Sequence, residues 1–256
     1  MSTAVSQAQR SATLTKLLTV GAGIGVVALA GLIATRPSPA APVAAAHSAR
    51  TAPDAVARTY SSVVTSIDAR RPGEAAYIAG DIPRAVEQFE RAVEADPRDP
   101  EALNNLGQVL VRSGRVPEAI PHFDRAIAIV PGKWSYHFNR ARAFATMEEW
   151  PRAIEGYRDA LRVFPDDYVT YFNLAKALQK SGDLRGAIEA FEHAIRLAPG
   201  EADFHLAHGV ALEAAQRKGD AAAAYRKYLE LAQAAPEPDK VKARIALLEG
   251  GAPAAR

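Results

Sequence analysis

A proline recurs every 34 residues through the middle of this chain, and this period constrains the fold more than any other feature. The residues before each proline recur in the same phase, with a small residue five positions before it, an aromatic eight before it and an alanine twelve before it. A fixed period of this length predicts an array of one supersecondary unit. The prolines are Pro97, Pro131, Pro165 and Pro199; the small residues are Ala92, Ala126, Ala160 and Ala194; the aromatics are Phe89, Phe123, Tyr157 and Phe191; and the alanines are Ala85, Ala119, Ala153 and Ala187.

The spacing inside one unit predicts two helices. Leu103, Leu106 and Leu110 recur at i, i+3 and i+7, which places them on one face of a helix. A polar break at Gly114 separates them from a second apolar face that includes Phe123. Each unit is therefore expected to be a helical hairpin that buries its apolar face by stacking on its neighbours. Small residues that would let the two helices approach closely stand at Gly73, Gly107, Ala141, Ala175 and Gly209.

The pattern A-x3-F with a proline at a period of 34 resembles the tetratricopeptide repeat, and the resemblance covers residues 66–249. It implies an all-α fold, a right-handed superhelical solenoid of helix-turn-helix repeats. The expected units are an incomplete repeat at 72–99 and full repeats at 100–133, 134–167, 168–201 and 202–236.

Capping helices are expected at both ends of the array, because terminal repeats would otherwise expose apolar faces. The N-terminal cap is predicted at 54–71 and the C-terminal cap at 237–249. Pro72 and Gly73 are expected to interrupt the chain, so the first helix of the incomplete repeat should begin near Glu74.

Residues 17–35 form an uncharged segment between Lys16 and Arg36. As a helix they would span about 28 Å, close to the thickness of a bilayer core. This segment predicts a transmembrane anchor, which would precede the solenoid as one N-terminal transmembrane helix. The alternative is a cleaved secretory signal, because Ala28-Leu29-Ala30 fits the cleavage rule.

The flanks of this segment suggest its orientation. The tail at 1–16 is short and basic, which favours a cytoplasmic N-terminus and repeats that face the periplasm or the exterior. A signal would instead give a secreted or periplasmic protein. The Pro- and Ala-rich residues 36–53 read as a linker between the membrane and the repeats.

Composition argues against several function classes. The chain has no cysteine, so it has neither disulfides nor thiolate metal sites, and its net charge of +2 is too weak to indicate nucleic acid. No catalytic motif or phosphate-binding loop occurs, so neither an enzyme nor a cofactor is predicted. His205 and His208 have a spacing that could bind a metal, but they stand at packing positions of the repeat, which favours a structural role and no metal site.

The front helices of the repeats carry the predicted binding groove. Asn105, Asn139 and Asn173 recur at one position, so stacking should align their amides. An amide can both donate to and accept from a peptide backbone, and the family resemblance implies that some members use asparagine here in that way. Asparagine is also common at this position without such a role. Cations and apolar side chains expected beside the amides are Arg112, Arg142, Lys176, Lys180, Phe138 and Phe172.

These features predict a non-enzymatic scaffold tethered to a membrane. Its groove would bind an extended, acidic segment of a protein partner, a membrane or envelope protein, in the assembly or maturation of an envelope complex. An exposed charged face is also typical of a helix that is merely solvated. A second interpretation of the function stays open as well. In it the chain is a permanent accessory subunit of a membrane complex, held by the transmembrane helix and the outer faces of the solenoid.

Overall fold

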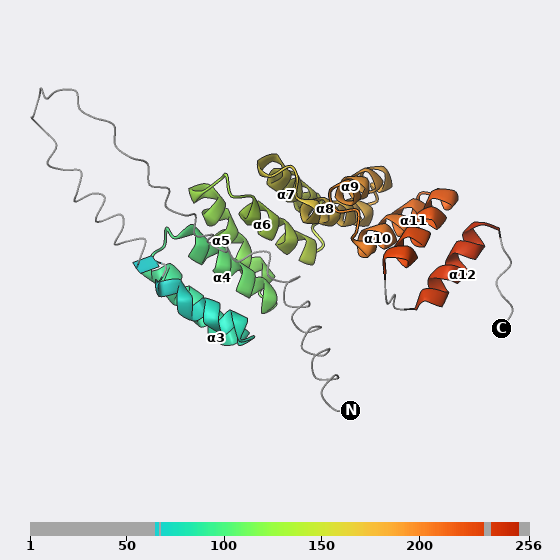
Figure 1. Ribbon diagram of the computed structural model, residues 1–256. Coiled ribbons are helices and arrows are strands. Elements are labelled where there is room, and N and C mark those ends of the chain that lie inside the picture. Colours follow the sequence, from blue (N-terminus) through green and yellow to red (C-terminus); the bar gives the residue numbers. More distant parts are fainter. Residues whose placement is uncertain (1–64, 67, 233–236, 251–256) are drawn as a thin grey trace, which may run out of the picture. The chain divides into compact units, whose positions relative to one another are not determined.

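The computed structural model describes residues 65–66, 68–232 and 237–250, and every regular element in these ranges is a helix (Figure 1). The predicted tail, anchor and linker at 1–16, 17–35 and 36–53 lie outside the described residues, as does most of the predicted cap at 54–71. None of the described helices combines the length and the apolar character that crossing a bilayer requires.

The helices follow one another as antiparallel pairs, each made of a front helix and a back helix. Each back helix also packs on the front helix of the next pair, as between α5 and α6, α7 and α8, and α9 and α10 (Figure 1). Helical residues 68–78 precede the labelled helices. The labelled helices are α3 (Ile82–Ala95), α4 (Pro100–Arg112), α5 (Val116–Ile129), α6 (Trp134–Thr146), α7 (Trp150–Val163), α8 (Tyr168–Ser181), α9 (Leu184–Leu197), α10 (Ala202–Ala214), α11 (Lys218–Leu231) and α12 (Pro238–Leu248).

The two helices of a pair approach closely where the front helix has a glycine and the back helix an aromatic ring. A Cβ atom built on Gly107 would lie 2.6 Å from the Phe123 ring, and one on Gly209 would lie 2.6 Å from the Tyr225 ring. No side chain fits in these positions, because real Cβ contacts are longer. The predicted role of the small front residues is therefore confirmed. The alanines expected at the same contacts, Ala85, Ala119, Ala153 and Ala187, are fully buried.

In the third pair, α6 and α7, the glycine of the close contact stands on the back helix and not on the front helix. Its front position is Ala141, and a Cβ built on Gly156 of α7 would lie 2.9 Å from the Cβ of Ala141. The close approach of the two helices is thus kept with the small side chain on the other partner.

The turn between the front and back helices uses a left-handed residue at a fixed position of the repeat. Glycine supplies it in three turns, since only glycine adopts positive φ without a steric cost. Two other turns place a charged or amide residue there. The five residues are Gly80 (φ 77°), Gly114 (φ 85°), Glu148 (φ 58°), Gly182 (φ 92°) and Gln216 (φ 61°).

The first repeat differs from the sequence prediction. Residues 68–78 are continuously helical, so Pro72 and Gly73 do not interrupt the chain, and the predicted helix start near Glu74 is wrong. The physical reason is that Gly73 occupies the close-approach position, where an added Cβ would lie 2.8 Å from the Phe89 ring. The helix must pass through Gly73 to bring it there. The boundary predicted between a cap at 54–71 and an incomplete repeat at 72–99 therefore does not exist as a break in the helix.

A single helix, α12, follows the last pair and packs on α11. It lies within the segment 237–249 that the sequence predicts as a cap. Its Ile245 is buried, and Val241 and Leu248 pack beside it. Arg244 forms an ion pair with Glu213 of α10, which links α12 to both helices of the last pair.

Candidate binding surfaces

Two front helices carry a cation over an aromatic ring in the same register. Arg142 Cζ lies 5.7 Å from the centroid of the Phe138 ring, and Lys176 Nζ lies 5.5 Å from that of Phe172. Each pair is spaced i, i+4, which brings both side chains to one face of the helix. The two cations are exposed and the two rings are half-buried. Within each of these two helices, the structure thus brings together a cation and a ring that the sequence predicts for the groove.

Neighbouring aromatic side chains hold these rings in place. Phe138 contacts Trp134 and Tyr157, each with ring centroids 5.8 Å apart. Phe172 stacks on Phe204 of the next front helix, with centroids 4.6 Å apart. Such packing fixes the orientation of the rings, so the cations lie over a pre-formed aromatic surface. Sequence reasoning missed Trp134 of α6 and Phe204 of α10, although both stand on front helices.

The remaining predicted cations lie elsewhere on the front helices. Arg112 Cζ is 5.0 Å from the Tyr77 ring centroid, and Lys180 is exposed at the end of α8. Within the described residues, none of Arg112, Arg142, Lys176 and Lys180 has an acidic side chain within ion-pair distance. Other arginines nearby do have such partners, for example Arg152 with Glu149. The positive charge of the predicted groove is therefore not compensated by this part of the chain.

The asparagine ladder differs from the expected row of free amides. Asn105 and Asn139 are buried, at 6% and 5% exposure. Asn139 Nδ2 donates to Asn104 Oδ1 of the preceding repeat at 2.9 Å, and Asn173 Nδ2 donates to the Val169 carbonyl at 2.8 Å. These amides join front helices or bond to their own helix. Of the three, only Asn173 is half-buried rather than buried.

His205 and His208, whose spacing could bind a metal, make local contacts within the repeats. His205 is buried and donates from Nε2 to the Pro199 carbonyl at 3.2 Å, as His137 does to Pro131 at 2.9 Å two repeats earlier. His208 Nε2 lies 3.9 Å from a carboxylate oxygen of Glu192. Across the described ranges, no group of His, Asp and Glu side chains is arranged to hold a metal ion.

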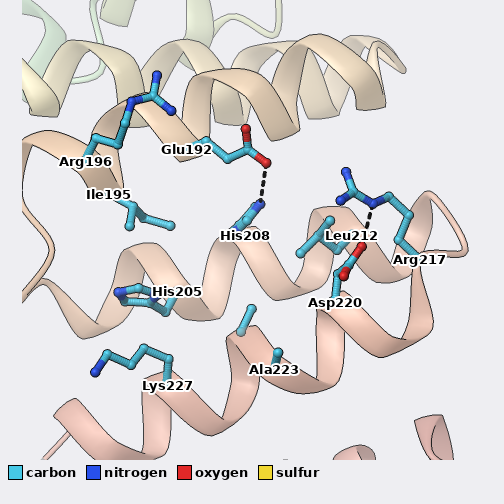
Figure 2. A pocket seen from close by; sticks show the side chains of 11 residues that line it. Glu192, Ile195, Arg196, His205, His208, Leu212, Arg217, Asp220, Ala223 and Lys227 are labelled. Carbon is cyan, nitrogen blue, oxygen red and sulfur yellow. Dashed lines mark hydrogen bonds and ion pairs between the residues drawn. The ribbon is translucent and has the colours of Figure 1, made fainter.

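A pocket of about 480 Å³ opens between α9, α10 and α11 (Figure 2). Most of the surface that lines it is carbon, to which Ile195, Leu212, Ala223 and Ala224 contribute. Charged and polar side chains surround these, and burial lowers the pKa of His208 below its ordinary value. The sequence analysis did not predict this pocket. Residues on three different helices form it, and only an alignment of the repeats by position would have shown that they meet. Its polar lining consists of Glu192, Arg196, His205, His208, Arg217, Asp220 and Lys227.

Comparison with known proteins agrees with the repeat architecture. The family model for the tetratricopeptide repeat matches residues 73–133 and 172–236. Repeats of this family are protein-interaction modules and are generally not enzymes. No curated protein sequence matches the chain.

Solved structures of MamA share the fold. A crystal structure of MamA protein has a TM-score of 0.61 and 22% sequence identity, and the match covers 68% of this chain and 98% of that one. MamA from residue 41 to its end, from Desulfovibrio magneticus RS-1, has a TM-score of 0.62 and 21% identity, covering 66% and 97%. At these identities the likeness is one of fold alone.

Proposed function

We propose that this chain is a tetratricopeptide repeat protein, as the match of that family's model to residues 73–133 and 172–236 supports, and that it binds an extended, acidic segment of a protein partner across its front helices. The observation that carries the proposal is the repeated pair of a cation over a ring, Arg142 with Phe138 and Lys176 with Phe172. Because these cations have no acidic partner within the described residues, carboxylates of a bound segment can supply the missing charge.

In this proposal the aromatic rings recognise apolar side chains of the partner segment. Phe138 and Phe172 are half-buried, so part of each ring stays accessible to an apolar side chain of the partner. An acidic segment with one or two apolar residues would therefore place carboxylates near Arg142 and Lys176 and apolar side chains beside the rings. In this proposal Asn173, the least buried of the three amides, accepts a hydrogen bond from the backbone of such a segment through Oδ1, because its Nδ2 donates to the Val169 carbonyl.

The proposal includes a membrane tether. Residues 17–35 would anchor the chain, and residues 36–53 would hold the repeats away from the bilayer on the periplasmic or exterior side. In that setting the partner is a membrane or envelope protein, and binding serves the assembly or maturation of an envelope complex.

Charge reversal on the front helices tests the proposed groove. A short labelled peptide of alternating acidic and aliphatic residues is titrated with protein, and binding is followed by fluorescence anisotropy. Arg142→Glu with Lys176→Glu is expected to weaken binding about a hundredfold, because each change replaces attraction with repulsion. Arg185→Glu is the matched control, since Arg185 of α9 is 91% exposed and pairs only with Glu189 on its own helix.

The outcome also separates the two proposed modes of action. If the double reversal leaves peptide affinity unchanged while circular dichroism shows native helicity, the groove proposal fails. Stoichiometric recovery of one partner through detergent and high salt, insensitive to the same reversal, would favour the permanent-subunit interpretation.

A further inference from the structure

Exposed apolar side chains gather at the turns that join one repeat to the next. Each back helix ends and the following front helix begins at such a turn, so these turns share one edge of the array. Three consecutive turns, at 130–133, 164–167 and 198–201, follow α5, α7 and α9. We call the large exposed apolar side chains at and beside them the apolar edge; they are Ile129, Val130, Val163, Phe164, Tyr168 and Leu197.

Aromatic contacts connect neighbouring turns along this edge. Trp134, the first residue of α6, has its ring centroid 5.9 Å from that of Phe164, the residue after α7. Tyr168, the first residue of α8, lies with its ring centroid 5.9 Å from that of Phe204 in α10. The exposed side chains of successive turns are therefore linked through these rings and form a row across the repeats.

The opposite edge, at the turns inside the repeats, has a different surface. Its exposed positions are mostly charged or polar, as at Arg115, Asp183 and Arg217, although Ile78 is exposed at the first of these turns. The apolar character is thus concentrated on the edge between repeats.

The fold does not require apolar side chains at this edge. Asp96 stands in the first turn between repeats, at the position that Val130 and Phe164 occupy 34 and 68 residues later. Its carboxylate accepts hydrogen bonds from Ser66 Oγ and Arg98 N. Val130 and Phe164 instead stay exposed. A contiguous apolar surface that the fold itself leaves in water indicates a surface that is covered in use.

The chain joins the repeats at this same edge. The described helix before α3 begins beside the first turn between repeats, because Ser66 Oγ donates to Asp96 Oδ2 at 2.7 Å and Arg70 Nε lies 3.2 Å from Asp99 Oδ2. The segment that leads from the predicted anchor at 17–35 therefore enters the array at the apolar edge. A tether raises the effective concentration of the bilayer around the repeats, which favours contact with a surface beside the attachment point.

The chemistry of the edge fits a lipid surface. Branched aliphatic and aromatic side chains are those that settle in the interfacial layer of a bilayer. They stand here at the tips of turns, so a flat surface can contact several turns at once. Exposed charges along these turns have both signs, with Lys133 and Arg196 against Asp166 and Glu201. Apolar contact, and not attraction to anionic lipid, would therefore provide the binding.

We propose that the apolar edge docks on the surface of the bilayer that holds the predicted anchor, with Val130, Phe164 and Leu197 in the interfacial layer. The inference rests on the membrane tether of the proposed function. The lipid it fits is a zwitterionic phospholipid such as phosphatidylcholine, because the charges along the turns are mixed.

The two tryptophans of the chain test the proposal, because they stand at opposite edges of the array. Trp134 begins α6 at the apolar edge, and Trp150 begins α7 at a turn inside a repeat. Full-length chains with Trp150→Phe or Trp134→Phe are reconstituted into phosphatidylcholine vesicles whose acyl chains carry bromine near the headgroup. Bromine quenches tryptophan only at close range. Relative to vesicles without bromine, the emission of Trp134 is expected to fall, while that of Trp150 should not change.

Carboxylates placed on the edge test its role directly. In the chain with Trp150→Phe, Val130→Asp together with Leu197→Asp is expected to abolish most of the quenching of Trp134, because a carboxylate is costly to bring into a bilayer. Both positions are exposed, so the fold tolerates the change. Val210→Asp is the matched control, since Val210 is exposed within α10 away from the turns, and it should keep the quenching. Circular dichroism checks that each variant has native helicity.

The outcomes separate the docked edge from the tether. Chain that floats with the vesicles but leaves Trp134 unquenched keeps the tether and overturns the docked edge. Chain that does not float with the vesicles overturns the tether, and the docked edge with it. Equal quenching of Trp134 and Trp150, or full quenching in the chain with the two new carboxylates, also overturns the docked edge. A blue shift of Trp134 emission that requires membrane proteins in the vesicles assigns the edge to a protein partner and overturns the lipid assignment.

Discussion

At the scale of single residues, the turn between front and back helices shows how one backbone angle constrains the sequence. Gly114 and Gly132 both have open space around the Cβ position, but only Gly114 has positive φ. The two glycines therefore differ in backbone conformation and not in steric surroundings. Glu148 and Gln216 occupy the left-handed position without glycine, at a cost that these turns carry permanently.

This contrast gives opposite effects for the same substitution. Gly114→Ala is expected to lower the free energy of unfolding by about 1–2 kcal/mol, because alanine is strained in the left-handed region. Gly132→Ala should leave it unchanged or raise it by up to about 1 kcal/mol, because alanine restricts the unfolded chain. Urea titrations followed by circular dichroism measure both. Equal losses in the two variants would show that backbone φ does not set the cost.

Two half-buried histidines predict how stability depends on pH. Burial lowers the pKa of His122 in α5 and of His208 in α10 below the ordinary value. The unfolded chain therefore binds protons at a higher pH than the folded chain, and protonation favours unfolding. Stability is full above the unfolded pKa of about 6.5 and falls as the pH drops through the lower folded values.

The free energy of unfolding is accordingly expected to decrease between about pH 7 and pH 5, a window above the titration of most carboxylates. The variant with His122→Gln and His208→Gln should show a flatter dependence, because it has lost two groups that take up protons on unfolding. Urea midpoints measured across this window give the slope. Identical slopes for the variant and the parent chain would assign the pH dependence to other groups.

At the scale of elements, the two helices of a pair are held at close distance by an aromatic ring on one helix that packs against a glycine on the other. Gly107 and Phe123 belong to α4 and α5, and the Phe123 ring fills the space in which a Cβ of residue 107 would lie. The ring is fully buried, so it cannot swing into solvent. The pair therefore behaves as a unit in which neither residue can change alone.

A double-mutant cycle measures this dependence. Gly107→Ala alone is expected to lower the free energy of unfolding by about 1–3 kcal/mol through overpacking. In the background of Phe123→Leu, whose side chain is smaller, the same change should cost less, so the two effects are not additive. Thermal and urea denaturation of the four proteins give the coupling energy. Strict additivity would mean that the two side chains do not meet.

The sequence was sufficient to predict the helix pairs. The 34-residue period identifies equivalent positions in successive repeats, and the helical period identifies the residues that share one face of a helix. It failed at Pro72 and Gly73, where local rules indicate a break but the packing partner, Phe89, lies 16 residues away. It also missed that Asn139 bonds to Asn104, since that bond crosses from one repeat to the next. The cations over rings were predictable as neighbours on a helix, whereas their lack of acidic partners became visible only in three dimensions.

At the scale of the whole molecule, the question is how the repeats are attached to the cell. The uncharged residues 17–35 predict that the full chain stays in the membrane during carbonate extraction, while a chain lacking residues 1–35 is released. Protease added to intact spheroplasts should digest the repeats if they face outward. A mature N-terminus at Gly31 would instead indicate a cleaved signal, and full protection of the repeats from protease would contradict the outward-facing anchored chain.

The pocket beside His208 has a consequence for how the array loses its structure. In an array whose units touch only their neighbours, cooperativity passes through each junction in turn. At the α5–α6–α7 junction, Arg140 forms ion pairs with Asp124 and Asp159. The α9–α10–α11 junction has a pocket instead of such ion pairs. Transient opening should therefore begin at this seam and release α10 to α12 as one block. In hydrogen exchange, amides of those helices would show a common, lower protection than amides of α5 to α7.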